Sequence, residues 1–140
     1  MLGQETHSNP EWRKFHVYGQ SGVGGVLNPW GYLGGNVNFH TFTQEAGLLH
    51  YGFGIGAFAG QDIWNSASPI FGGTAYFQLW IGEKNHHFET RFGGILLSIP
   101  EVPYAPLLQF GYRFQRPYRA SFWFLHAGTG GFSVGGGMGL

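Results

Sequence analysis

The chain contains 140 residues, of which 26 are glycine; 19% of its residues are aromatic and only 10% are charged. An average globular domain carries roughly 7% glycine and roughly 25% charged residues, so this is not the composition of an ordinary water-soluble domain. The formal net charge is zero, which excludes the basic surface that nucleic-acid binding requires, and the absence of cysteine excludes disulfides and thiolate sites.

Helices are disfavoured along the whole sequence. Glycine recurs every few residues, and each glycine inside a helix costs roughly 1 kcal/mol relative to alanine. The purest apolar stretch, residues 93–99, is far shorter than a transmembrane helix, which needs about 20 residues. Residues 1–11 show neither strand-like alternation nor the basic start and apolar run of a signal peptide. The chain could be cytosolic or a mature exported protein with an added initiator Met, and its composition favours the second. We expect a polar N-terminal tail, residues 1–11, ahead of one domain formed by residues 12–140.

Alternation of polar or small residues with apolar ones, the pattern of a β-strand, begins at Lys14 and recurs to the end of the chain. In the first segment, for example, Lys14 and His16 share one face and Phe15 lies on the other. The alternating segments are, in chain order, residues 14–23, 36–41, 50–57, 74–81, 87–94, 108–114, 121–128 and 132–140. About eight strands of about ten residues are typical of the smallest membrane-spanning barrels.

The apolar face of these strands is predicted to point outward. A water-soluble barrel needs many charged residues on its exterior, but this chain has only 7 acidic and 7 basic residues, several of them in turns. The opposite face carries mainly Gly, His, Gln and Asn, which suit a narrow interior, and a closed barrel leaves no unpaired strand edge in hydrocarbon. The sequence therefore predicts an all-β fold, a single eight-stranded antiparallel transmembrane β-barrel in a bacterial outer membrane, in contact with outer-membrane lipids and lipopolysaccharide.

The lengths of the connections predict the orientation of the barrel. The connections after the second, fourth and sixth segments, residues 44–47, 83–85 and 116–119, are short, as periplasmic turns are. The longest connections, residues 60–73 and 100–106, follow the third and fifth segments, where extracellular loops belong. Both termini are therefore expected on the periplasmic side.

Aromatic residues near the strand ends are candidates for the girdles that mark the two membrane interfaces. For each of them the alternative is packing within a loop. The six candidates are Trp12, Trp30, Tyr32, Trp64, Tyr104 and Tyr118.

The inward face is predicted to carry a network of polar and charged side chains. A barrel of about eight strands is just wide enough for side chains to fill it. Glu89 would therefore be paired with Arg91 or Arg113, because an unpaired buried charge costs several kcal/mol. A proton or ion path would need a wider barrel with a continuous wet lining, so a polar plug that fixes strand register is the favoured interpretation. The predicted lumen network comprises Glu89, Arg91, Arg113, His16, His40, His50 and His126.

Seven histidines suggest a metal site, but their arrangement argues against one. His86 and His87 are adjacent, so a strand points them to opposite faces. Glu89 is the only carboxylate that accompanies the interior histidines. We therefore expect no metal and no other cofactor.

Two further patterns contain residue types found in catalytic or phosphate-binding sites. Ser133 with His126 and Glu89 supplies the residue types of barrel enzymes that modify lipid A, but no H-x-S spacing is present, because Gly128 lies two positions after His126. The glycine runs of residues 52–56 and 135–137 lack the lysine and the strand-to-helix context of a phosphate loop. These glycines are expected instead to make room for large side chains of neighbouring strands, namely Tyr76, Trp80 or Tyr18.

Three segments resemble small outer-membrane β-barrel proteins of Bacteroidota-type bacteria. Residues 81–89, Ile-Gly-Glu-Lys-Asn-His-His-Phe-Glu, resemble a turn of that family in which a G-K-K-N-H-type segment precedes H-F-E-L-G-L-G. Residues 110–114, Phe-Gly-Tyr-Arg-Phe, resemble its G-Y-R-Y/F strand, and residues 125–128, Leu-His-Ala-Gly, its F-R-A-G strand. The resemblance covers roughly the second half of the chain. It implies an outer-membrane location and a barrel fold, and says little about activity.

The expected function is that of a small barrel that docks beside larger outer-membrane proteins as an accessory or scaffolding subunit, with no pore and no catalysis. The alternative is an outer-membrane enzyme that modifies lipid A or phospholipid. A third hypothesis is a soluble ligand-binding barrel, which predicts an apolar cavity and a wetted exterior.

Overall fold

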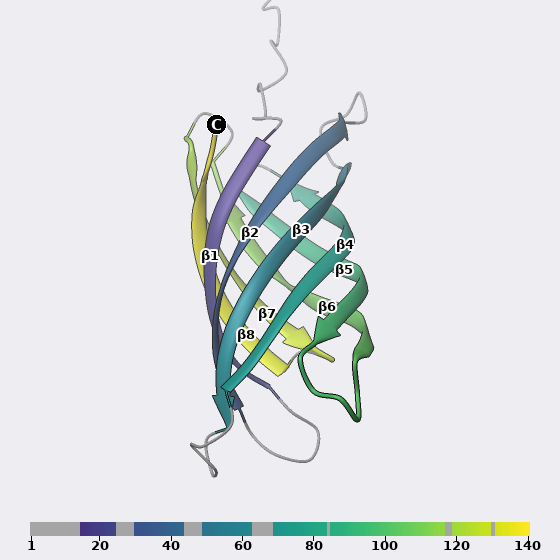
Figure 1. Ribbon diagram of the computed structural model, residues 1–140. Coiled ribbons are helices and arrows are strands. Elements are labelled where there is room, and N and C mark those ends of the chain that lie inside the picture. Colours follow the sequence, from purple (N-terminus) through teal and green to yellow (C-terminus); the bar gives the residue numbers. More distant parts are fainter. Residues whose placement is uncertain are drawn as a thin grey trace, which may run out of the picture.

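In the computed structural model the chain forms a closed barrel of eight strands (Figure 1). The structure describes residues 15–24, 30–43, 49–62, 69–83, 85–116, 119–129 and 131–140. Each strand pairs antiparallel with the next, and β1 pairs with β8 to close the barrel. The strands are β1 (Phe15–Gly24), β2 (Trp30–Thr43), β3 (Leu49–Asp62), β4 (Pro69–Glu83), β5 (His86–Leu97), β6 (Tyr104–Gln115), β7 (Ser121–Gly128) and β8 (Gly131–Gly139). The predicted all-β, eight-stranded antiparallel barrel is confirmed; among the described residues, no helix has the length and apolar character of a membrane span.

Several strands are longer than the alternation predicted. β2 already begins at Trp30, β3 continues to Asp62, β4 begins at Pro69 and β6 begins at Tyr104. The expected loops over residues 60–73 and 100–106 were therefore too long. Considered alone, the glycine and proline content of these segments predicts loops. Backbone pairing with a neighbouring strand extends the sheet through them: Gly60 pairs with Ile70, and Pro106 pairs with Gly94.

The apolar face of the wall points outward, as predicted. Phe53, Phe77 and Phe110 are 43%, 61% and 45% exposed, because each strand alternates its side chains between the two faces. Directly paired phenylalanines form one continuous row over five strands. Three of the neighbouring pairs, Phe15–Phe39, Phe39–Phe53 and Phe77–Phe92, have their rings in edge-to-face or stacked contact. The row consists of Phe15, Phe39, Phe53, Phe77 and Phe92. A barrel with an apolar ligand cavity would have the opposite arrangement.

Inward glycines leave space for aromatic rings from other strands. A side chain at Gly54 would meet the ring of Tyr76, and one at Gly137 would meet Tyr18. The expectation that the glycine runs make room for Tyr76 and Tyr18 is thereby confirmed. Gly135 does the same for the ring of Phe124.

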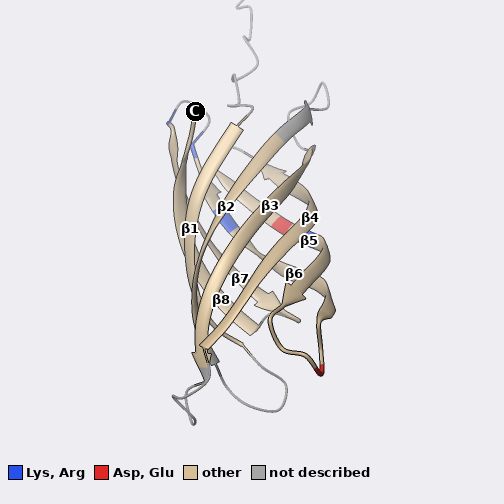
Figure 2. Ribbon diagram, viewed as in Figure 1, with Lys and Arg blue, Asp and Glu red and all other residues tan. Residues whose placement is uncertain are grey.

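The two ends of the barrel differ. The C-terminus and the start of β1 lie together at one end, called here the terminal end, and the β5–β6 loop projects from the other, the loop end (Figure 1). Backbone hydrogen bonds from Leu97 N to the Pro103 carbonyl and from Ser98 N to the Phe71 carbonyl fix the base of this loop. Most of the described wall carries no charge (Figure 2). The predicted tail, residues 1–11, lies outside the described residues.

Candidate functional site

A single carboxylate, Glu89 of β5, holds together two arginines and a histidine from three strands. It is 0% exposed, and strand alternation turns it to the interior together with Arg91. Its Oε1 accepts a hydrogen bond from Arg91 Nε at 2.7 Å and lies 3.0 Å from Nε2 of His126 on β7. Its Oε2 accepts from Nη1 of Arg113 on β6 at 3.2 Å. Arg91 and Arg113, the two predicted partners of Glu89, therefore both bind its carboxylate.

The guanidinium group of Arg113 lies between two aromatic rings. Its Cζ is 3.6 Å from the ring centre of Trp80 on β4 and 3.7 Å from that of Phe122 on β7. Its Nε donates to Gln115 Oε1 at 2.8 Å, and the Gln115 amide lies 3.2 Å from His16 Nε2. Because the faces of aromatic rings attract cations, this sandwich bridges the lumen from β4 to β7.

Aromatic rings also surround Arg91. Its Cζ lies 4.8 Å from the ring centre of Tyr18, 5.1 Å from that of Tyr76 and 4.9 Å from that of Phe124. These three residues belong to β1, β4 and β7. The arginine is therefore held near the barrel axis by groups from widely separated strands.

A chain of hydroxyl and amide groups continues from these rings. The hydroxyls of Tyr18 and Tyr76 are hydrogen-bonded to each other across the lumen. Tyr76 donates to Asn38 Oδ1 at 2.6 Å, and Asn38 in turn donates to Gln78 Oε1. Buried polar groups that satisfy one another in this way specify one arrangement of the interior.

Three buried histidines gather around Trp80 toward the terminal end. The ring centres of His16, His50 and His87 lie 5.6, 5.5 and 5.9 Å from the indole. The indole thus occupies the space that these imidazoles share. Across the described part of the chain, no three histidine or carboxylate side chains are placed to hold a metal ion.

The structure brings most of the predicted lumen network together. Glu89, Arg91, Arg113 and His126 are in direct contact, and His16 joins them through Gln115. His50 is also buried, but it lies with the other histidines beside the indole. The side chain of His40 lies outside the described residues.

The predicted aromatic girdle is wrong at one position. Tyr32 is only 6% exposed and packs inside the barrel against Phe58. The reason is that β2 begins at Trp30, so Tyr32 follows the inward phase of Asn36. Tyr104 is 74% exposed at the start of β6, next to the loop end. Trp12, Trp64, Tyr118 and the side chain of Trp30 lie outside the described residues.

Sequence reasoning missed several interior residues. The aromatic ones are Phe122 and Phe124, which are 4% and 0% exposed, and the polar ones are His87 and Gln115, each 1% exposed. Their positions follow from extending the inward phase of His126 and Arg113 along their own strands. That signal was present in the sequence. Phe122 and Phe124 were nevertheless missed because large aromatic side chains were expected on the outward, apolar face rather than on the inward one.

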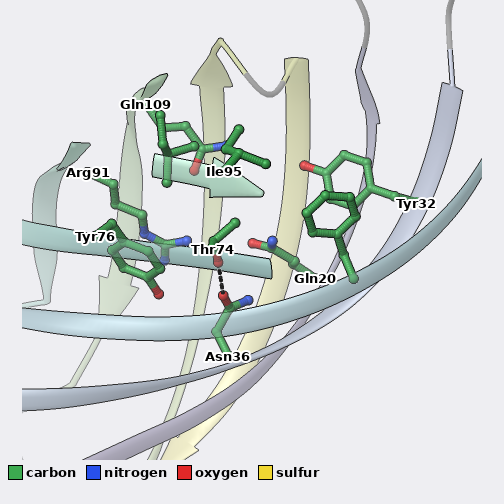
Figure 3. Close-up of a pocket in the computed structure, with 10 residues that line it drawn as sticks. Gln20, Tyr32, Asn36, Thr74, Tyr76, Arg91, Ile95 and Gln109 are labelled. Atoms are coloured by element: carbon green, nitrogen blue, oxygen red, sulfur yellow. Dashed lines mark hydrogen bonds between the residues drawn. The ribbon is translucent and has the colours of Figure 1, made fainter. Parts of the chain in front are cut away.

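A small cavity lies in the lumen beside Arg91 (Figure 3). Its volume is about 30 Å³, which is room for one or two water-sized groups. Arg91, Tyr76 and Asn36 are among the residues around it, and Thr74 donates to Asn36 Oδ1 at 3.4 Å. Tyr32 and Phe58 are among the apolar residues that line it.

The three residues considered for the enzymatic alternative, Ser133, His126 and Glu89, all lie inside the barrel. Ser133 on β8 pairs directly with His126 on β7, whose Nε2 contacts Glu89. All three side chains are buried, at 2%, 1% and 0% exposure. The set is therefore assembled in a closed interior.

Comparison with models of known protein families gives no match, and neither does comparison with curated proteins. The chemistry of the lumen is consequently argued from its own residues. Within the described residues, it holds one carboxylate, two guanidinium groups and a surrounding set of rings and amides, an arrangement suited to binding charge and to locking eight strands in register.

Proposed function

We propose that this chain spans a bacterial outer membrane, with both termini in the periplasm, and serves as an accessory or scaffolding subunit beside larger outer-membrane proteins. The observation that carries the proposal is a closed barrel whose outward side chains are apolar and whose interior is filled. Such a barrel offers its wall, rather than a channel, for function.

The outer wall supports the membrane assignment. The outward residues Leu33, Ile55 and Leu125 are 69%, 54% and 52% exposed. Large apolar side chains in this number on a free surface would be an aggregation hazard in water. They match the lipid-facing band of a small transmembrane barrel, whose strands close on themselves and leave no edge.

The filled interior supports a role without conduction. Arg113 lies between Trp80 and Phe122, and the hydroxyls of Tyr18 and Tyr76 meet across the lumen. These contacts join β4 to β7 and β1 to β4 across the barrel axis. An ion would have to displace them to pass.

The wall also has a side suited to close lateral contact. A row of small outward residues crosses five strands in direct register: Gly136, Gly19, Gly35, Ala57 and Gly73. Small residues let a neighbouring protein approach closely within a membrane. We assign the scaffolding contact to this side, from β8 through β1 to β4.

The membrane assignment is tested by fractionation and by electrophoresis of the unboiled protein. We expect the chain in the outer-membrane fraction and a shift in mobility on boiling, because a closed barrel resists detergent unfolding. A preparation that stays monodisperse in water without detergent would contradict the proposal.

The scaffolding role is tested by cross-linking from single cysteines, since the chain has none of its own. Leu33→Cys lies beside the row of small residues on β2, and Leu125→Cys lies on β7 as the matched control. With a photoreactive maleimide in native membranes, we expect a discrete protein adduct from Leu33→Cys only. No discrete adduct from either site, together with purification as a lone small barrel in mild detergent, would contradict the scaffolding role.

A second candidate function, an enzyme acting on lipid A or phospholipid, is favoured by the strand pairing of Ser133 with His126, whose Nε2 contacts Glu89. Its weakness is burial, because a lipid head group would have to enter the lumen. It predicts altered lipid A or phospholipid on overexpression, abolished by His126→Ala and by Ser133→Ala. Unchanged lipid profiles, measured by mass spectrometry, would eliminate it.

A further inference from the structure

We propose that the lumen cavity is a binding site for a small monovalent anion of the size of chloride. The inference concerns the interior alone and does not depend on the scaffolding role. It rests on two observations: the balance of buried charge, and hydrogen-bond donors that line the cavity without an acceptor.

The buried charges of the described interior do not balance. Arg91 and Arg113 are 1% and 0% exposed, and Glu89 is the one carboxylate buried with them. His126, the third group on Glu89, adds positive charge if protonated and none if neutral. The network therefore carries an excess of at least one positive charge. Water can satisfy hydrogen bonds in such a place, but it cannot neutralise the charge.

Unused donors identify where the missing negative charge belongs. Arg91 Nη2 and Asn36 Nδ2 are both buried without a hydrogen-bond partner, and both residues line the cavity. Nε of Arg91 and Oδ1 of Asn36 are engaged, with Glu89 and Thr74 respectively, which holds the two side chains in place. Figure 3 shows both beside the same space.

One acceptor also lines the cavity. Gln20 Oε1 is buried there without a donor. Rotation of this amide exchanges its oxygen and nitrogen positions, so that its NH₂ group replaces the oxygen. With that rotation, three side chains from β1, β2 and β5 offer N–H groups to the same cavity.

The size and the lining of the cavity restrict the ligand. About 30 Å³ admits a halide ion but not a phosphate ester or a lipid head group. Ile95 and Leu107, 8% and 5% exposed, are further apolar residues in its lining. An apolar lining of this kind strengthens the attraction between an anion and Arg91 by excluding water.

The test is a crystal structure of the full-length protein grown in bromide, with anomalous data collected at the bromine edge. We expect one anomalous peak in the lumen, in contact with Arg91 Nη2 and Asn36 Nδ2. A cavity that holds only water, with no anomalous signal, would overturn the proposal.

A second test, made in solution, measures unfolding of a variant in which a carboxylate side chain takes the place of the bound anion. Asn36→Asp puts a carboxylate on the cavity wall, and Glu101→Gln, exposed on the β5–β6 loop, is a control that also changes the net charge by one unit. In detergent, the unfolding midpoint of wild type and of Glu101→Gln should rise on exchange of gluconate for bromide at constant ionic strength. Asn36→Asp should show no such rise. An equal rise in all three proteins, or in none, would refute the site.

Discussion

At the scale of single residues, the interior depends on one carboxylate. Glu89 contacts Arg91, Arg113 and His126 at 2.7 to 3.2 Å, and no part of it reaches solvent. Charges in such surroundings are tolerated because each is paired or faces an aromatic ring. The network is therefore sensitive to the loss of either kind of partner.

Glu89→Gln should destabilise the barrel by about 3–5 kcal/mol, because it leaves two buried guanidinium groups without a counter-charge. The free energy of unfolding in urea, measured in detergent micelles or lipid vesicles, would show this. The control is Glu101→Gln, an exposed carboxylate on the β5–β6 loop, which should change stability by less than about 0.5 kcal/mol. Equal effects of the two substitutions would contradict a structural ion pair.

Arg113→Lys should cost about 2 kcal/mol even though the charge is kept. A lysine cannot stack as a plane between Trp80 and Phe122, and its single ammonium group cannot reproduce the fork that reaches both Glu89 and Gln115. Arg119→Lys, at an exposed position near the terminal end, is the matched control and should be neutral in the same unfolding assay. A neutral Arg113→Lys would show that charge alone matters at this site.

At the scale of the strands, the two faces use glycine for opposite purposes. Inward glycines such as Gly54 leave space for rings that cross the lumen, whereas outward Gly94 has no atom of another residue near the place where a side chain would begin. Register decides which is which, because a shift by one residue exchanges the two faces of a strand.

Gly54→Ala should therefore destabilise the barrel by about 1–3 kcal/mol, since the added methyl group meets Tyr76 and Asn38. Gly94→Ala should be neutral within about 0.5 kcal/mol. Both would be measured by equilibrium unfolding, with the boiling-dependent gel shift used to verify that a barrel has formed. If Gly94→Ala were the more damaging of the two, the assignment of the faces would be wrong.

At the scale of the whole molecule, the wall and the interior have exchanged the roles that they play in water-soluble proteins. Apolar side chains such as Phe77 and Phe92 lie outside, and the charged residues Glu89, Arg91 and Arg113 lie inside. That arrangement suits the proposed membrane setting, because hydrocarbon would solvate the wall while the buried carboxylate pairs with both arginines in the lumen.

Phe77→Arg, in the middle of β4, should cost about 2–4 kcal/mol when the barrel is folded into lipid vesicles, because the charge is placed deep in hydrocarbon. Tyr104→Arg, at the loop end of β6, is equally outward and should cost no more than about 1 kcal/mol, because it lies near the interface. The comparison is made by urea titration in vesicles. No dependence on depth would argue against a membrane around the wall.

Much of the fold could be predicted from the sequence, and the site only in part. The alternation of Glu89 and Arg91 with Phe88 and Phe92 was enough to place the first pair inside and the second outside. It could not show that Arg113 lies between two rings. Trp80 belongs to β4, which meets β6 only across the lumen, and the contact with Phe122 depends on the register of β6 against β7. Tyr32 was misplaced for a related reason: whether β2 begins before it depends on pairing with β1 and β3.

The sequence by itself determined the eight strands and the face of each that points outward, since a repeat of two residues is a local property that needs no neighbour. Only the tertiary structure decided which inward side chains meet. Barrel closure pairs β1 with β8 and brings β5, β6 and β7 around one carboxylate, so contacts such as that of Glu89 with His126 depend on strand register and curvature. The cavity beside Arg91 exists for the same reason, as the space left where side chains from several strands do not fill the lumen.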